Sequence, residues 1–318
     1  MKPSAILTAD WHIREDTPTC RTDDFFAAQI KKIEFILALS EKHNCPILIA
    51  GDLFHKAKSS PFLESTLMLL LRAYPSKNFY SKRLLVIPGQ HDLPNHNFDL
   101  IHKSSFGVMI ASQMIDHLDS EKPVKSSKFI LTGFSYGSKI KPCREASRRL
   151  KNDFRSIALA HFLVTESSPK GKSKVLRDFA GATSAKTVLK NNPDYDLIVT
   201  GDNHKSFSES YQDRLLVNPG NITRQAADQI DHKPRVALWY AKTNEIEWVE
   251  IPIKKDSVTA DHLEEQNERD SRLSSFVEKL NDGYEIGLSF ERNLKEYLQS
   301  NRTKKRTTEI IWEMVENE

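Results

Sequence analysis

The chain has 318 residues, of which 39% are hydrophobic and 28% are charged, and it carries a formal net charge of +3. This length suits one large α/β domain with a smaller appendage, or two modest domains. No stretch approaches the roughly 18 uninterrupted apolar residues of a membrane span, and the N-terminus becomes polar too early for a signal peptide. We therefore expect a cytoplasmic protein without membrane segments. Its mildly basic charge permits a polyanionic partner but does not require one.

The three cysteines, Cys20, Cys45 and Cys143, lie far apart, and the sequence has no Cys-x-x-Cys pair. This spacing argues against a disulfide framework and against a thiolate zinc site, and it favours a reducing compartment.

Short apolar runs bounded by turn residues are typical of buried parallel strands. Such runs predict strands over 4–9, within 46–55, and over 83–87, 129–134, 157–160, 197–200 and 215–217, with a closing hairpin over 235–240 and 245–253. Helical periodicity predicts helices over 25–40, 62–74 and about 184–191. Residues 95–128 are harder to place, with 110–115 as the best candidate element.

From Lys254 onward strand signals stop and charge density rises. Apolar residues at helical spacing predict helices over 263–280, around 290–298 and around 310–315. We therefore expect two domains, 1–253 and a small helical C-terminal module over 254–318. The module could dock a partner or cap the larger domain.

Most predicted strands end in residues that can bind metal. These are Asp10 and His12, Asp52 and His55, Gln90 and His91, His161, and Asp202 and His204. Because parallel strands gather their carboxyl ends at one edge of a sheet, we expect a single cluster there. Mixed imidazole and carboxylate ligands suit Mn, Fe or Zn better than Mg or Ca.

The ordered motifs at 10–12, 51–55, 89–92, 161 and 201–204 resemble those of the calcineurin-like metallophosphoesterases. Ser60-Pro61 after the second motif and Asn218-Pro219-Gly220 resemble the DNA-repair nuclease branch, which includes SbcD-like and phage recombination endonuclease subunits. The resemblance covers about residues 4–253 and implies a four-layer α/β/β/α metallophosphoesterase sandwich. It also implies a metal-dependent DNA exo- or endonuclease of repair or recombination.

The same resemblance implies two divalent metal ions, with Mn preferred and Mg, Fe or Zn as alternatives. The first would be held by Asp10, His12, Asp52 and His204, and the second by Asp52, Gln90, His161 and Asp202. The family usually has Asn at position 90 and His at position 202. Both replacements can still ligate a metal, so we expect a second site that is harder and weaker.

In such a site, two metals about 4 Å apart would activate a bridging hydroxide for in-line attack. His91 is the expected catalytic residue at the leaving oxygen, with His55 beside it on the phosphate. Asp92 would orient the loop or an imidazole. The expected partners are DNA, an SMC-like ABC ATPase subunit and a second copy of the chain, paired through 62–74.

Several alternatives stay open from the sequence. The protein could instead be a phosphoesterase for small substrates, or a scaffold whose second metal site has decayed at Gln90 and Asp202. Asp202 could cap backbone amides. Trp11 could stack on a base or pack in the core, and the basic stretch 139–155 could contact DNA phosphates or form a solvated helix face. The apolar helix over 62–74 could be buried within the monomer.

Overall fold

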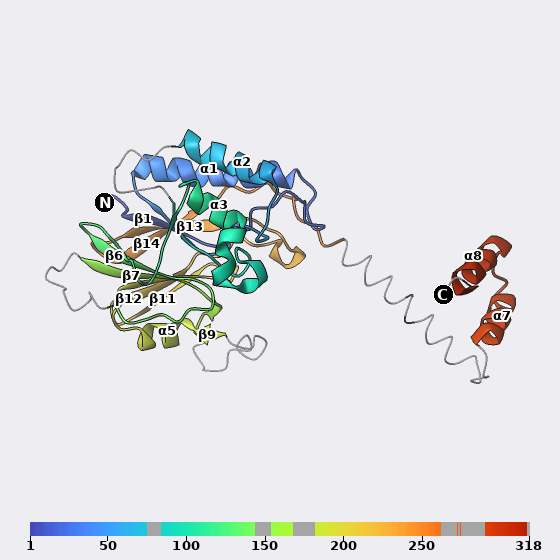
Figure 1. Cartoon of the computed structure of the whole chain (residues 1–318). Helices are drawn as coiled ribbons and strands as arrows, with labels where there is room; N and C mark the ends of the chain where they lie inside the picture. The colour runs from blue at the N-terminus through green and yellow to red at the C-terminus, as the bar shows by residue number, and fades with distance from the viewer. Residues whose placement is uncertain are drawn as a thin grey trace. The chain divides into compact units, whose positions relative to one another are not determined.

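The computed structural model describes residues 1–74, 84–143, 154–167, 182–261 and 290–316, with Arg272 and Ser274. The chain divides into two compact units, Met1–Thr259 and Ala260–Glu318 (Figure 1). The helix expected over 263–280 lies outside the described residues except at those two positions. The predicted domain boundary after residue 253 and the role of the C-terminal module stay predictions.

The first of two six-stranded sheets carries the N-terminal strands. Its order is β14 (Glu245–Glu250), β13 (Arg235–Tyr240), β1 (Ala5–Thr8), β2 (Ile47–Ala50), β3 (Leu84–Ile87) and β4 (Asp116–His117). Strands β1 to β4 are parallel, and β13 joins β1 in antiparallel orientation. The carboxyl ends of β1, β2 and β3 therefore lie at one edge.

The second sheet has the order β11 (Phe207–Tyr211), β12 (Arg214–Asn218), β10 (Leu197–Gly201), β7 (Arg155–His161), β6 (Phe129–Phe134) and β5 (Val124–Lys125). Its four central strands are parallel, and the two edge strands are antiparallel to their neighbours. A small separate pair joins β8 (Val164–Thr165) to β9 (Thr183–Ser184).

The two sheets pack face to face. Alternate residues of their strands form one core between them, including Leu48 of β2, Leu159 of β7 and Trp239 of β13. The other face of the first sheet packs on α1 (Phe25–His43), α2 (Pro61–Ala73) and α3 (Ser105–Ala111), and that of the second sheet on α5 (Ala185–Asn191). The expected four-layer α/β/β/α sandwich is confirmed.

Local sequence explains where the long helices begin. Asp24 accepts a hydrogen bond from the Ala27 amide at the start of α1, and Ser60 caps α2 ahead of Pro61. Only one face of α2 is buried, and Phe62 and Leu69 remain 59% and 66% exposed. Burial of this helix all round is therefore wrong for the monomer, and a second subunit over the exposed face stays a prediction.

The predicted element over 110–115 is wrong in position. Helix α3 begins earlier because Ser104 caps it at the Gly107 amide, and Asp116–His117 then adds the short strand β4. The sequence also failed to reveal β11, in which Ser208 and Ser210 are exposed and Glu209 is only partly buried. An edge strand of this kind lacks the apolar run that marks a buried strand.

Short 3₁₀ helices span Pro94–His96, Phe98–Lys103 and Ala227–Gln229. In the second unit, α7 (Phe290–Ser300) and α8 (Lys305–Glu316) match the two last predicted helices. No helix in the described part of the chain is long and apolar enough to cross a lipid bilayer.

Candidate metal centre

Asp52 lies directly after β2 and is approached from both sheets. Its Oδ2 atom lies 3.6 Å from Nε2 of His12, which follows β1, and 3.4 Å from Nε2 of His161, at the end of β7. Its Oδ1 accepts a hydrogen bond from the His91 amide at 2.9 Å. Asp52, His12 and His161 are each at most 3% exposed, so the packed sheets bring sequence-distant ligands to one carboxylate.

The remaining candidate ligands join this cluster. The Nε2 atoms of His12 and His204 are 3.2 Å apart, and Asp10 Oδ1 accepts a hydrogen bond from the Asp202 amide at 3.0 Å. Among the described residues, three groups have ligand atoms close enough to share an ion: Asp10, His12 and His204; Asp10, Asp52 and His161; and His12, His55 and His91. The first group falls within the first expected ligand set, whereas the second joins Asp52 and His161 to Asp10, so the division of ligands between two ions stays a prediction.

The backbone at these positions is unusual. Asp10, His12, Asp52 and Asp202 have φ values of 50°, 44°, 51° and 79°, in the left-handed region that non-glycine residues rarely adopt. Such strain persists only where surrounding structure holds it, and it concentrates at functional sites. Gly51 supplies needed space, because a Cβ at that position would overlap the His161 ring.

The donor set fits divalent cations. Buried atoms without a hydrogen-bond partner among the described residues include Asp10 Oδ2, Asp52 Oδ2, Gln90 Oε1 and His161 Nε2. Orphaned buried polar atoms are rare unless something else satisfies them. His161 Nδ1 donates to the Ala50 carbonyl at 2.6 Å, which leaves Nε2 as the ligating nitrogen, an orientation common for metal-bound histidine.

The pKa shifts of the buried groups indicate the same need for positive charge. Burial raises the pKa of Asp10 to about 8, with Asp52 adding to the shift. Burial alone would lower the pKa of His161, but the charges of Asp52 and Asp10 raise it to about 10. Without metal, this cluster therefore binds protons that a bound cation would displace.

The two positions that depart from the family pattern are in contact. Gln90 Nε2 donates a hydrogen bond to Asp202 Oδ1 at 2.7 Å. The amide is thereby fixed with its oxygen, Oε1, as the free atom. Gln90 and Asp202 therefore form a pair at the predicted second site.

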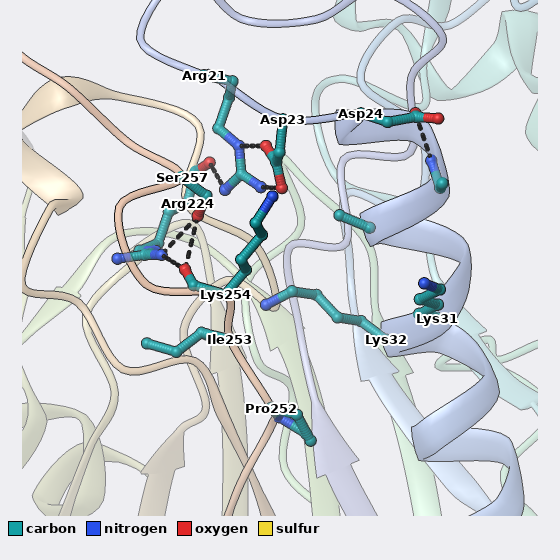
Figure 2. Close-up of a pocket in the computed structure, with 12 residues that line it drawn as sticks. Arg21, Asp23, Asp24, Lys31, Lys32, Arg224, Pro252, Ile253, Lys254 and Ser257 are labelled. Carbon is teal, nitrogen blue, oxygen red and sulfur yellow. Dashed lines mark hydrogen bonds and ion pairs between the residues drawn. The ribbon is translucent and has the colours of Figure 1, made fainter.

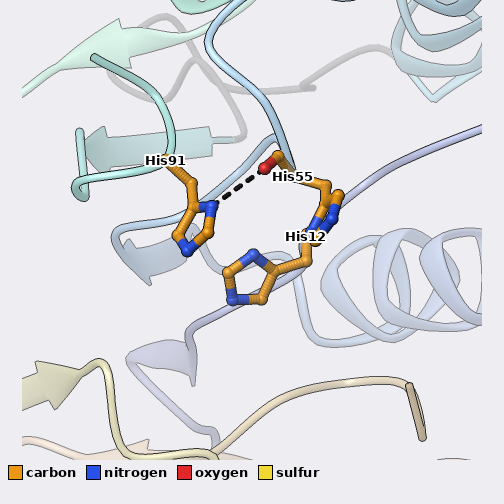
Figure 3. Close-up of side chains that lie close together, drawn as sticks. All are labelled: His12, His55 and His91. Carbon is orange, nitrogen blue, oxygen red and sulfur yellow. Dashed lines mark hydrogen bonds between the residues drawn. The ribbon is translucent and has the colours of Figure 1, made fainter. Parts of the chain in front are cut away.

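Three histidines line one side of the centre (Figure 3). His91 Nδ1 donates to the His55 carbonyl at 2.9 Å, and the two rings stack with centroids 5.6 Å apart. The His91 ring lies 4.8 Å from that of His12. Burial, followed by the charges of Arg14 and His91, lowers the pKa of His55 to about 4, so its ring is neutral near pH 7.

Asp92 is fully buried, and backbone amide groups occupy its carboxylate. Its carboxylate accepts hydrogen bonds from the amides of Leu53 at 3.1 Å, Phe54 at 2.8 Å and Gly89 at 2.9 Å. It thus joins the loops after β2 and β3, which carry Asp52 and Gln90. Of the two roles expected for Asp92, the geometry shows the ordering of the loop.

Other contacts were not evident from the sequence. Asn218 accepts from Thr200 Oγ1 and donates to the carbonyls of Asn203 and Lys205, so it holds the loop that carries Asp202 and His204. Gln229 Nε2 lies 3.4 Å from His204 Nδ1. The sequence singled out Asn218 only as part of the Asn-Pro-Gly motif, and no pattern singled out Gln229.

Packing resolves the alternative for Trp11, whereas the alternatives for the basic stretch 139–155 stay open. Trp11 is fully buried and donates to Thr8 Oγ1 at 2.9 Å, so it packs in the core and cannot stack on a base. In the basic stretch, Arg155 bonds to the Ala241 and Lys242 carbonyls and pairs with Asp196, and Lys141 pairs with Glu121. The cations at 144–151 lie outside the described residues.

The sequence profile of the calcineurin-like phosphoesterases matches residues 4–206. The chain belongs to this family, whose members bind two divalent metal ions, and it is a metal-dependent phosphoesterase. No curated protein matches the sequence.

The solved structures to which the chain is similar include a protein of Thermus thermophilus, with 13% identity, a TM-score of 0.46 and coverage of 79% of this chain and 100% of that one. An archaeal phosphodiesterase has 13% identity, a TM-score of 0.37 and coverage of 77% and 98%. A dimetal phosphatase from Danio rerio has 10% identity, a TM-score of 0.45 and coverage of 79% and 100%.

Replacing Asp92 with Asn puts an amide NH₂ against backbone donors. We expect Asp92→Asn to lower the free energy of unfolding by about 1–3 kcal/mol, because at least one buried amide loses its acceptor. Metal content should also fall, since both loops carry candidate ligands. Urea unfolding and elemental analysis measure the two effects. The exposed change Asp99→Asn serves as the control, and equal behaviour of the two variants would exclude this role.

Proposed function

We propose that this phosphoesterase acts on DNA as a metal-dependent phosphodiesterase, an exo- or endonuclease of repair or recombination. The convergence of His12 and His161 on the buried Asp52 carboxylate, with Asp10 in the same cluster, is the observation that supports the hydrolytic role. The resemblance of Gly51–His55, Ser60-Pro61 and Asn218-Pro219-Gly220 to the DNA-repair nuclease branch supports DNA as the substrate.

The proposed ligands are Asp10, His12, Asp52 and His204 for one cation, and Asp52, Gln90, His161 and Asp202 for the other. When bound, the cations would supply Lewis-acid polarisation of the phosphoryl group and a nucleophile from water near neutral pH. Nitrogen and oxygen donors together favour Mn, with Fe, Zn and Mg as alternatives.

His91 is the proposed group at the leaving oxygen. Its Nδ1 is fixed by the His55 carbonyl, so Nε2 is the nitrogen that can exchange a proton. His55 stacks on His91 and is positioned to contact the phosphate. Asp92 contributes by fixing the loops that carry Asp52 and Gln90, through backbone hydrogen bonds.

End-labelled duplex and single-stranded DNA, each incubated with Mn or Mg, test the proposed substrate. We expect cleavage with Mn that EDTA abolishes and that Asp52→Asn reduces to the level without enzyme, because Asp52 belongs to both ligand sets. Hydrolysis of bis(p-nitrophenyl) phosphate without cleavage of either DNA would instead identify a phosphoesterase for small substrates. A protein that purifies with one metal or none, and cleaves neither, would be a scaffold.

His91→Ala separates proton transfer from metal binding. We expect this variant to retain its metal content and to cleave DNA about 10²-fold or more slowly, because general acid catalysis contributes this much. Rates and elemental analysis measure both properties. The matched control is His102→Ala at an exposed position, and an unchanged rate for His91→Ala would rule out the assignment.

We also propose that the exposed face of α2 pairs two copies of the chain. Phe62 and Leu69 are large apolar side chains on that face, and burying them would remove apolar surface from water. Leu69→Glu should shift sedimentation at micromolar concentration from dimer to monomer, whereas Lys42→Glu on α1 should not. A monomeric wild type would refute the pairing. An SMC-like ATPase partner stays a prediction from the resemblance.

A further inference from the structure

A pocket with a volume of about 410 Å³ lies outside the metal centre. It is bounded by the loop before α1, the first half of α1, Arg224, and the 252–257 segment that follows β14 (Figure 2). None of the candidate metal ligands lines it. The two sites are therefore built from different residues.

Positive charge dominates the lining of this pocket. It contains two carboxylates, Asp23 and Asp24, and five cations, Arg21, Lys31, Lys32, Arg224 and Lys254. Both carboxylates are already engaged. Asp23 accepts from Arg21 Nε at 2.9 Å and Nη2 at 2.7 Å, and Asp24 caps α1 at the Ala27 amide. Neither accepts a hydrogen bond from Lys32 or Arg224 among the described residues.

Lys32 and Arg224 are the two cations whose burial is otherwise unexplained, with exposed fractions of 6% and 5%. Lys32 Nζ donates to the Ile222 carbonyl at 3.0 Å, its one hydrogen bond among the described residues. Arg224 donates to the carbonyls of Ile230 and Lys254 and to Ser257 Oγ. All of these acceptors are uncharged, although buried charges are normally paired with opposite charge.

Burial without a charged partner affects the pKa of Lys32. Burial, followed by the charges of Arg21 and Arg224, lowers the pKa of its ammonium group to about 7, although the charge of Asp23 acts in the opposite direction. In Figure 2, the Lys32 side chain extends from α1 into the space between this helix and the 252–257 segment. A dianion in that space would supply the missing charge.

We propose that this pocket binds a phosphomonoester, with its phosphoryl dianion against Lys32 and Arg224. Two cations without a charged partner match the two charges of this group, and both side chains form strong charge-assisted hydrogen bonds to phosphate oxygens. The volume exceeds that of one phosphate and lies in the range of small-ligand sites. Ala28, Pro252 and Ile253 supply an apolar wall for the organic part.

The pocket borders the metal centre through one loop. Arg21 Nη1 donates to the Arg224 carbonyl, and the next residue, Gln225, contacts the His12 carbonyl through Nε2 at 3.4 Å. The proposed binding does not depend on DNA as the substrate of the metal centre, because the pocket recognises the phosphomonoester group of its ligand. Binding can therefore be tested without catalysis.

Calorimetric titration of the full chain with deoxyadenosine 5′-monophosphate, with and without EDTA, measures this binding. We expect saturable binding of one equivalent that persists in EDTA and in Asp52→Asn, because no metal ligand takes part. No saturable binding by the wild-type chain in EDTA would overturn the proposal, whatever the outcome of the nuclease assays.

Lys32→Met keeps the length of the side chain and removes its charge. We expect its dissociation constant to be at least about tenfold higher than that of the wild type, as the loss of a hydrogen bond to a charged group implies. Lys42→Met, an exposed change on the same helix, is the matched control and should bind normally. Lys32→Gln is the second variant if Lys32→Met does not fold. Unchanged affinity in the folded variant would overturn the proposal.

Two oligonucleotides of one sequence identify the source of the phosphomonoester. The wild-type chain in EDTA could bind the 5′-phosphorylated strand more tightly than the 5′-hydroxyl strand. If Lys32→Met then weakens binding of the phosphorylated strand, the result would support a nucleic-acid end as the ligand. Binding of the mononucleotide but of neither strand would support a free nucleotide. The proposal would be overturned if both strands bind with equal affinity, Lys32→Met does not change that affinity, and the mononucleotide does not bind.

Discussion

The carboxylate of Asp52 is the constraint on which the geometry of the centre depends. It is 1% exposed and within 3.6 Å of imidazoles from both sheets. A buried carboxylate is costly unless positive charge or hydrogen bonds compensate it. The two sheets must therefore pack so that His161 reaches this carboxylate, whereas His12 follows the neighbouring strand of the same sheet. Gly51, which leaves room for the His161 ring, is part of the same requirement.

Buried polar side chains outside the ligand set preserve this relation. Asp92 ties together the loops after β2 and β3, and Asn218 ties the loop after β10 to the end of β12. Each bonds to backbone atoms and so fixes the chain itself. Because both residues are fully buried, their bonds lie in a low-dielectric environment and are strong. Ligand positions thus depend on groups that need never touch a substrate.

Sequence reasoning was effective where one local signal determines the structure. The strand that ends at Gly51, and the polar residues that follow it, could be read from an apolar run and a turn. Contacts between distant loops carry no such signal. Gln229 beside His204 and Lys32 beside Arg224 depend on how loops cross, which residue order alone does not reveal. Strand β11 was missed for a different reason, since its edge position allows polar residues.

The pair formed by Gln90 and Asp202 bears on how the second metal site departs from its relatives. Considered one at a time, Gln90 in place of Asn and Asp202 in place of His suggest that the second metal site has decayed. Their hydrogen bond of 2.7 Å shows that the two residues fit each other. The bond fixes the amide so that its oxygen, and not its nitrogen, is free, and Asp202 adds a negative charge close to Asp10. Oxygen donors and added charge favour a hard cation, so we expect these two residues to alter the cation preference of the proposed second site without removing its ligands.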